Sequence, residues 1–277
     1  MNKADLYYKY NLRQILHDLI KDENPRPKYK DGTPAHSFYI TQVFEEYDID
    51  KGHFPLTTLR NTAIKTGIKE ILWIYQDQTS SLDKARERGI NWWEDWNICD
   101  NTIGQRYGAT IKKWDLMNNL LKNLKEDPFS RRHIINMLQE SDLQETDGLY
   151  PCAYETIWSV RNIENQFYLD LTLNQRSNDY IMAGYINKIQ YVALQLMVCS
   201  HLGYKPGKFC HFVQNLHIYD RHIDAANEIL NRYSIEGIKP RIELNVSKNF
   251  YDITIDDFEI FDVKDIPKIE STLELAI

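Results

Sequence analysis

Apolar side chains recur every three or four residues in four segments of the chain, which is the spacing of one face of an α-helix. The expected helices are residues 6–21, 62–75, 114–125 and 187–202. The helix at 114–125 should end near Pro128, because proline cannot continue a helix. The segment 187–202 is apolar on nearly every side, so we expect that helix to lie at the centre of the core.

Alternation of apolar and polar side chains predicts strands, mainly in the second half of the chain. The clearest case is residues 167–173, where Phe and Leu at odd positions alternate with more polar side chains. Further strands are expected at residues 37–44, 133–138, 154–160 and 209–216, with short strands and turns in the tail 251–277. No internal repeat or linker divides the chain. The pattern therefore predicts one α+β domain over residues 1–277, a mixed β-sheet packed with helices.

Composition narrows the classes of function. With 43% hydrophobic residues in 277, the chain can bury a sizeable core. The net charge is -7, whereas a duplex-binding protein usually carries a basic face, so we expect no DNA partner. No stretch approaches the roughly 20 apolar residues of a membrane span, and the N-terminus shows no signal-peptide pattern. Clusters of arginine are then better interpreted as local anion pockets.

Cysteine usage favours a reducing compartment. Cys99, Cys152, Cys199 and Cys210 never stand at CxxC spacing, and four cysteines in so long a chain do not suggest a disulfide scaffold. A cytoplasmic location is the simplest expectation. No His/Cys cluster has the spacing of zinc ligands, so no metal is expected.

One cysteine lies between two basic motifs. Cys152 follows Pro151, with Arg131-Arg132 before it and Arg176-Ser177 after it. Guanidinium groups suit a phosphate dianion, and a cation-rich setting favours the thiolate, which is the nucleophile. The simpler interpretation is a buried core cysteine and solvated arginines. Cys199, inside the apolar helix, fits that interpretation well.

Other polar side chains also allow two interpretations. Glu70 lies beside apolar residues on the second helix, either solvated at its edge or desolvated in a pocket, where its pKa would rise and suit proton relay. His217 and Tyr219 alternate with an aliphatic pair, so both face the same side of a strand, as a polar surface or as donors to a sugar hydroxyl. Trp93 and Trp96 suit the core or the stacking of a flat heterocycle.

Taken in order, these motifs resemble the thymidylate synthase family over nearly the whole chain. The ordered set is specific, although each piece alone is weak, and it looks most like a divergent branch found in some bacilli and their phages. The motifs are Asp31-Gly32-Thr33, Lys69-Glu70-Ile71-Leu72-Trp73, Trp93-Glu94-Asp95-Trp96, Ser130-Arg131-Arg132-His133, Pro151-Cys152-Ala153-Tyr154, Arg176-Ser177-Asn178-Asp179, Asn187, His217-Ile218-Tyr219 and Leu275-Ala276-Ile277.

The resemblance implies the conversion of dUMP to dTMP. Cys152 is expected to add to C6 of uracil, Asn187 to pair with N3 and O4, Glu70 to organise proton transfer near O4, and Tyr107 to lie near C5. The phosphate would contact arginines and a serine, and the deoxyribose would contact a histidine and a tyrosine. The implied dUMP contacts are Arg131, Arg132, Arg176, Ser177, Asn187, His217 and Tyr219.

The resemblance also implies a co-substrate and a partner. The folate 5,10-methylenetetrahydrofolate carries both the carbon and the hydride, so no metal is needed. Trp93 and Trp96 would line its site, Asp179 would bond the pterin ring, and Ala276 would contribute from the C-terminal end. The family forms an obligate homodimer through the sheet face. Arg131 and Arg132 are implied to reach the phosphate in the partner's site.

The chain departs from the family pattern at four places. Ala153 stands where a histidine usually follows the nucleophile. The usual arginine of the early phosphate loop is missing at Asp31-Gly32-Thr33, where Arg26, Lys28 and Lys30 are the candidates to substitute for it. The usual Gly-x-Pro-Phe-Asn run is Ala183-Gly184-Tyr185-Ile186-Asn187, and Gln214-Asn215 replaces a Gly-Asp pair. These changes concern the shape of the pocket, and they leave the nucleophile and the arginines intact.

Two rival functions remain open at this point. A pyrimidine nucleotide hydroxymethylase shares the fold, with water replacing the hydride. Asn187 favours uracil over cytosine but does not distinguish methylation of dUMP from its hydroxymethylation. A binding protein without catalysis, for example one that binds RNA, is the second rival. The intact Cys152, Glu70 and Asn187 disfavour it, as does the acidic balance.

Overall fold

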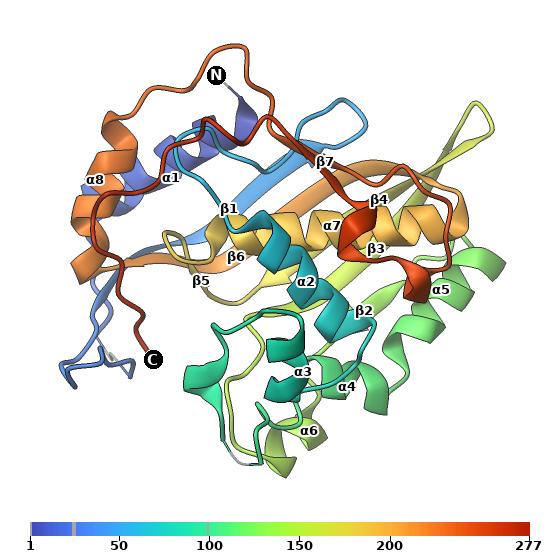
Figure 1. Ribbon diagram of the computed structural model, residues 1–277, viewed down its shortest axis with the longest axis horizontal. Helices are drawn as coiled ribbons and strands as arrows, with labels where there is room; N and C mark the ends of the chain where they lie inside the picture. Colours follow the sequence, from blue (N-terminus) through green and yellow to red (C-terminus); the bar gives the residue numbers. More distant parts are fainter. Residues whose placement is uncertain (1, 24–25, 99) are drawn as a thin grey trace.

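A six-stranded mixed sheet forms the base of the structure, a computed structural model that describes residues 2–23, 26–98 and 100–277 (Figure 1). The strands follow the order β1 (Ser37–Asp48), β6 (Lys205–Tyr219), β4 (Gln166–Gln175), β3 (Ala153–Ile163) and β2 (Ile134–Asn136). The short β5 (Asn178–Asp179) also pairs with β6. Only the contacts of β6 with β4 and β5 are parallel among these described pairings.

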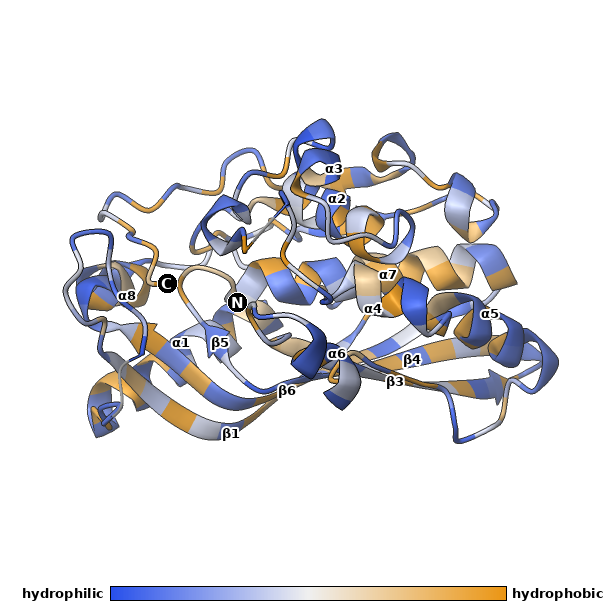
Figure 2. Ribbon diagram, turned by 90° about the horizontal axis from the view of Figure 1, so that it is seen from below, coloured by the Kyte–Doolittle hydropathy of each residue, from blue (hydrophilic) through white to orange (hydrophobic). Residues whose placement is uncertain are grey.

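Helices lie on one side of this sheet (Figure 2). The long α7 (Gly184–Leu202) runs along the sheet, and α2 (Ile64–Tyr75) packs against α7. The others are α1 (Lys3–Asp18), α3 (Leu82–Glu87), α4 (Gly108–Lys113), α5 (Leu116–Glu126), α6 (Glu140–Glu145) and α8 (Ile223–Asn231). No helix in the described part of the chain is long and apolar enough to cross a bilayer.

Smaller elements complete the chain. A second sheet pairs β7 (Arg241–Glu243) with β8 (Glu259–Phe261). Single turns of 3-10 helix are η1 (Glu94–Trp96), η2 (Asp220–His222), η3 (Phe250–Asp252) and η4 (Ile255–Asp257). The other side of the main sheet carries no helix in Figure 2. Phe44, Ile134 and Ile163, which belong to strands of this sheet, are exposed.

The strongly periodic segments are confirmed, with shifted ends. Residues 6–21, expected as a helix, give α1, which ends earlier because Leu19 takes a left-handed conformation at φ 46°. The expected strand 209–216 gives the longer β6. The apolar helix 187–202 is α7, buried along most of its length, but it begins earlier, at Gly184. The pattern missed α3, α4, α6 and α8, which are too short to show a clear period.

The close packing of α2 against α7 determines where the side chain of Glu70 lies. A Cβ on Gly67 of α2 would meet side-chain atoms of Ile186 and Gln190 at 3.3 Å, so a larger residue would push the helices apart. Glu70 lies one turn further along α2. This packing therefore brings its carboxyl group to the first turns of α7.

Candidate active site

A cavity of about 490 Å³ lies where β3 begins, β4 and β6 end, and α7 begins. Most side chains singled out from the sequence line it. They are Glu70, Trp93, Trp96, Tyr107, Cys152, Arg176, Ser177, Asp179, Asn187, His217, Tyr219 and Ala276. Strands and helices that are distant in sequence thus converge on one concave surface, which is the usual setting of a ligand site.

Arg176 anchors the segment that carries Cys152. Its Nη2 donates to the carbonyl of Tyr150 at 2.6 Å and lies 3.5 Å from Sγ of Cys152, while its Nε donates to the carbonyl of Pro151 at 3.1 Å. The hydroxyl of Tyr107 accepts the N–H of Cys152 at 3.1 Å. The thiol is therefore held at one place in the cavity by both neighbours.

Burial raises the pKa of the Cys152 thiol above its usual range. Arg176 lowers this pKa, which is the direction expected of a cation-rich setting, but burial has the larger and opposite effect. The other predicted arginines, Arg131 and Arg132, are exposed at the start of β2 and do not line the cavity of their own chain. One guanidinium near the sulfur does not outweigh its desolvation.

Glu70 is buried, which resolves the choice between its two interpretations. Only 6% of the residue is exposed, and the indole N–H of Trp92 donates to its Oε2. Burial raises the pKa of the Glu70 carboxyl from 4.5 to about 7, although hydrogen bonds from Trp92 and Gln190 lower it. Both protonation states are therefore populated near neutral pH, as a proton relay requires.

Asn187, in the first turn of α7, is held by three other amides. Its Oδ1 accepts from Nε2 of Gln175 at 3.0 Å and from Nδ2 of Asn178 at 3.1 Å. Its Nδ2 donates to Oε1 of Gln190 at 2.9 Å. The orientation of the Asn187 amide is thereby defined, with Oδ1 toward Gln175 and Asn178 and Nδ2 toward Gln190.

His217 and Tyr219 line the cavity from the same face of β6, as the alternation predicted. The aliphatic residues between and before them, Leu216 and Ile218, are fully buried on the opposite side. Nδ1 of His217 lies 3.0 Å from Oδ1 of Asn215, and burial lowers the pKa of His217. A neutral imidazole beside a phenol can donate or accept a hydrogen bond from a hydroxyl group.

An aromatic wall closes another side of the cavity. The ring of Trp93 packs edge-on against Tyr107 and Trp96, with centroids 5.2 and 5.5 Å apart. On the facing side, Oδ1 of Asp179 accepts the backbone N–H groups of Ile181 and Met182, both at 3.1 Å. A flat ring with polar edges could stack on these aromatic side chains and donate hydrogen bonds to the carboxylate of Asp179.

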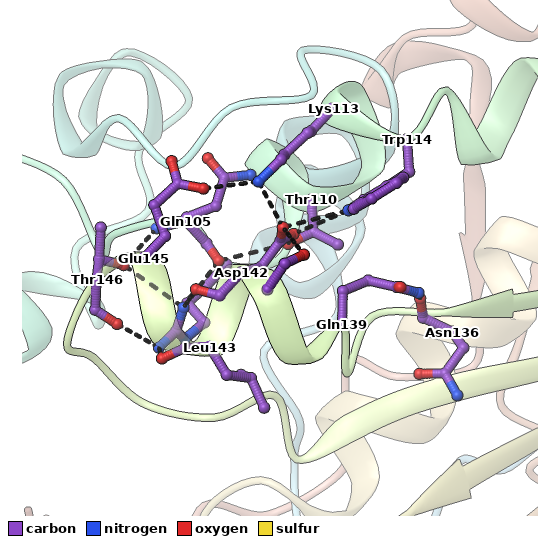
Figure 3. A network of polar contacts seen from close by, with 12 residues as sticks. Gln105, Thr110, Lys113, Trp114, Asn136, Gln139, Asp142, Leu143, Glu145 and Thr146 are labelled. Atoms are coloured by element: carbon purple, nitrogen blue, oxygen red, sulfur yellow. Dashed lines mark hydrogen bonds and ion pairs between the residues drawn. The ribbon is translucent and has the colours of Figure 1, made fainter.

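A polar network around the buried Asp142 connects α4 with α6 (Figure 3). In it, Oδ2 of Asp142 accepts from the hydroxyl of Thr110 at 2.7 Å, and Lys113 pairs with Asp142 at 2.8 Å. Arg106 donates to the carbonyl of Asp142 at 2.6 Å, and its guanidinium lies 5.4 Å from the ring centroid of Tyr150. The network therefore connects α4 and α6 to the residues just before the thiol.

Comparison with known proteins identifies the family. The thymidylate synthase family model matches residues 7–275. The chain belongs to the thymidylate synthase family. It is 49% identical to thymidylate synthase of Streptococcus pneumoniae strain 70585 and 48% identical to that of Streptococcus gordonii, with all of both chains covered. Membership makes the chain an enzyme, a methyltransferase of dTMP biosynthesis.

A solved structure confirms the α+β class of the fold. Thermostable thymidylate synthase A from Bacillus subtilis superposes with a TM-score of 0.89 at 32% identity, covering 99% of each chain. The mixed sheet packed with helices is therefore the thymidylate synthase fold. The resemblance that the ordered motifs carried is confirmed.

Some of the residues that differ from the usual family motifs line the cavity, and others do not. Ala153, Ala183 and Ile186 line it. Tyr185 points away, because its hydroxyl donates to the carbonyl of Ala4 at 2.7 Å in the core. The tyrosine at the position of the usual proline therefore does not fill the pocket.

The basic residues of the early loop do not line the cavity. Arg26, Lys28 and Lys30 are exposed, and among the described residues of that loop only Pro27 lines the cavity. The expected substitution for the family's loop arginine has no support from their positions. Instead, Arg221 connects this loop to the C-terminal tail, with bonds of 2.7 Å to Asp31 and 2.6 Å to Glu274.

The backbone of the tail also pairs with the early loop. The N–H of Ile277 donates to the carbonyl of Lys28 at 3.0 Å, and Ala276 packs with Tyr29 and Ala35. Ala276 thereby stands at the cavity, as expected. The last residues of the tail form part of the wall next to Tyr219.

Sequence reasoning missed several residues of the site. Trp92, Gln175, Asn178 and Gln190 all line the cavity and form hydrogen bonds to residues that had been singled out. The signal for Gln190 was its helical spacing of three from Asn187. Of the cysteines, Cys199 is buried as expected, and Cys99 lies outside the described residues.

Proposed function

We propose that this enzyme methylates dUMP reductively, with 5,10-methylenetetrahydrofolate as donor of carbon and hydride. The observation that supports this most directly is the position of Cys152. Its sulfur lies 3.5 Å from Arg176 in a cavity that also holds Asn187 and Glu70. A sulfur nucleophile, a phosphate-binding cation, a base-reading amide and a proton relay thus share one site.

The nucleotide lies with its phosphate at Arg176 and Ser177. From there the deoxyribose 3′-hydroxyl meets His217 and Tyr219, which share one face of β6. The uracil ring is read by Asn187, whose amide offers both an acceptor for N3–H and a donor for O4. This arrangement leaves C6 of the ring at the sulfur of Cys152.

The thiolate of Cys152 adds to C6, and the electron pair of the C5–C6 bond moves toward O4. C5 becomes an enolate carbon and can act as a nucleophile. Glu70 exchanges a proton near O4, since its pKa of about 7 keeps both forms present. Tyr107, whose hydroxyl accepts the N–H of Cys152, stays within reach of the proton at C5. Burial raises the pKa of the Cys152 thiol, and Arg176 opposes this effect and so favours the thiolate that reacts.

The aromatic wall supports a folate site. When bound, the folate supplies the one-carbon unit and the hydride. Trp93 and Trp96 would hold its rings, and Ala276 would cover them from the tail. Asp179 uses Oδ1 for two backbone N–H groups, and among the described residues its Oδ2 has no hydrogen-bond partner. That oxygen fits the donor edge of a pterin.

A homodimer would explain why Arg131 and Arg132 do not line the cavity of their own chain. Arg131 and Arg132 are exposed, and the nearby sheet face presents Phe44 and Ile134, with 55% and 47% of each residue exposed. Pairing two such faces would bury apolar area and carry both arginines toward the phosphate in the other subunit's site. The single domain over residues 1–277 and the cytoplasmic location remain predictions from the sequence.

One assay tests the function. The protein is incubated with dUMP and 5,10-methylenetetrahydrofolate, and the nucleotide product is identified by mass. We expect a methyl product. A hydroxymethyl product would instead assign the chain to the hydroxymethylase alternative, in which water replaces the hydride at the altered 183–186 loop. Bound dUMP without any product would contradict both enzymatic functions.

A further inference from the structure

We propose that His211 is a positioning residue that sets the base specificity of the site. Acting through Gln175, it holds the amide of Asn187 in the orientation that reads uracil and rejects cytosine. This inference rests on the proposed function, because it concerns the nucleotide that the cavity binds. His211 itself does not line the cavity.

His211 lies on the buried face of β6, behind the residues that line the site. It is fully buried, and its Nε2 lies 2.8 Å from Oε1 of Gln175. Burial lowers the pKa of His211 well below its usual range, and the neighbouring Lys188 lowers it further. The ring is therefore neutral and carries a single N–H. Since a carbonyl oxygen only accepts, that proton belongs on Nε2.

The N–H of His211 donates the first of several hydrogen bonds between side chains, and all of these bonds run in the same donor-to-acceptor direction. Gln175 accepts with Oε1 and donates with Nε2 to Oδ1 of Asn187. Asn187 in turn donates with Nδ2 to Oε1 of Gln190, at 2.9 Å. Gln190 then forms a side-chain hydrogen bond to Glu70. A histidine that donates at one end and a carboxyl that accepts at the other together fix every amide between them.

Asn178 cannot supply this orientation by itself. It also donates to Oδ1 of Asn187, at 3.1 Å. Its own Oδ1 is buried and has no hydrogen-bond partner among the described residues, so nothing there prevents its amide from turning over. Gln175 differs because His211 engages its oxygen. Two amides donate to Oδ1 of Asn187. Of these two, Gln175 is the one whose own orientation is fixed by a residue that does not line the cavity, His211.

The orientation of this amide distinguishes the two pyrimidines. Uracil offers a donor at N3 and an acceptor at O4, whereas cytosine offers an acceptor at N3 and a donor at its amino group. The arrangement with Oδ1 accepting and Nδ2 donating matches uracil. The reverse arrangement matches cytosine, but it would set N–H against N–H at Gln175 and two oxygens together at Gln190. The chain that starts at His211 opposes that reversal.

Binding of dUMP and of dCMP to the full-length protein tests the inference by calorimetry. In His211→Phe the ring can still pack on Phe209, which is parallel to within 17°, but the donor is lost. Losing one hydrogen bond should reduce the preference for dUMP over dCMP roughly threefold to tenfold. His211→Gln restores a donor at about the position of Nε2 and should keep the preference within about twofold of the wild type.

Gln195→Leu is the matched control. Gln195 is another buried amide of α7, but it donates to the backbone carbonyls of Leu169 and Lys208 and takes no part in the chain. This variant should be less stable while keeping the same preference for dUMP. An unchanged preference in a folded His211→Phe variant would overturn the inference, as would equal losses in the Phe and Gln variants.

A measurement on the unmodified protein covers the case in which His211→Phe does not fold. The nitrogen chemical shifts of the His211 ring, from selectively labelled protein, should report a neutral imidazole with the proton on Nε2. A proton on Nδ1 would overturn the inference. If the wild type fails to bind dUMP, the proposed function fails together with the inference. If it binds dUMP but His211→Phe discriminates as the wild type does, only the inference fails.

Discussion

Two arginine-bearing regions, equivalent in the sequence, differ in the structure. Arg176, at the end of β4, reaches the sulfur of Cys152 and the carbonyls before it. Arg131 and Arg132, before β2, are exposed and do not line the cavity of their own chain. The difference follows from the register along β3, because β4 ends beside Ala153, whereas β2 begins beside Ile157. The position of an arginine along the chain therefore does not show whether it reaches the cavity.

The largest effect is expected inside the cavity. Cys152→Ser should lower turnover at least about a thousandfold, because a serine hydroxyl is a far weaker nucleophile without a strong base beside it. Binding of dUMP, measured by calorimetry, should persist. Cys210→Ser is the control, since Cys210 lies on β6 outside the cavity and should keep full turnover. Turnover of Cys152→Ser within tenfold of the wild type would contradict the covalent role.

The buried acid of the cavity should also contribute to the pH dependence of stability. Folding raises the pKa of Glu70 from 4.5 to about 7, so the folded state binds more protons between these values. Stability should therefore fall as pH rises through this window, by up to about 3 kcal/mol. Glu70→Gln should remove that loss. The measurement is the free energy of unfolding of both proteins at about pH 5 and about pH 8, at equal protein concentration.

The same substitution at an exposed site provides the control for Glu70. Glu126 is exposed at the end of α5, so Glu126→Gln should follow the wild-type pH dependence. If the wild type and Glu70→Gln differ by the same free energy at both pH values, the raised pKa is wrong. The proton relay would then lose its physical basis.

A smaller effect separates the two arginine regions directly. Arg176→Ala and Arg131→Ala should each weaken dUMP binding roughly tenfold to a hundredfold, the cost of losing a charge-assisted bond to phosphate. Only Arg176→Ala should also lower the melting temperature, because Arg176 holds the carbonyls of Tyr150 and Pro151. Equal melting temperatures for the two variants would contradict a structural role that Arg176 has and Arg131 lacks.

Mixed dimers refine this comparison further. Arg131→Ala chains combined with Cys152→Ser chains should regain part of the wild-type activity, because one of the two shared sites then has both an intact thiol and an intact partner arginine. The mixture is assayed after subunit exchange, with each variant alone as reference. Mixed dimers that form but remain inactive would exclude shared sites. Dimers that never form would exclude the sheet-face interface.

Much of the fold was predictable because its long helices and strands bury apolar side chains at a regular spacing. The alternation along β4 and the apolar spacing along α2 and α7 are visible in the sequence, since burial selects side chains at the period of each element. Short helices such as α6 were not predicted. They are held by contacts from other parts of the chain, including the bond from Arg106 to the carbonyl of Asp142.

The sequence by itself determined which chemical groups this protein possesses: the thiol of Cys152, the carboxyl of Glu70 and the amide of Asn187, in an order specific to the family. Only the tertiary structure decided what state those groups are in. Desolvation raises the pKa of the thiol and of the carboxyl, and the orientation of the amide depends on neighbours from β4, β5 and α7. Local dielectric and hydrogen-bond direction arise from packing in three dimensions, so no spacing along the chain encodes them.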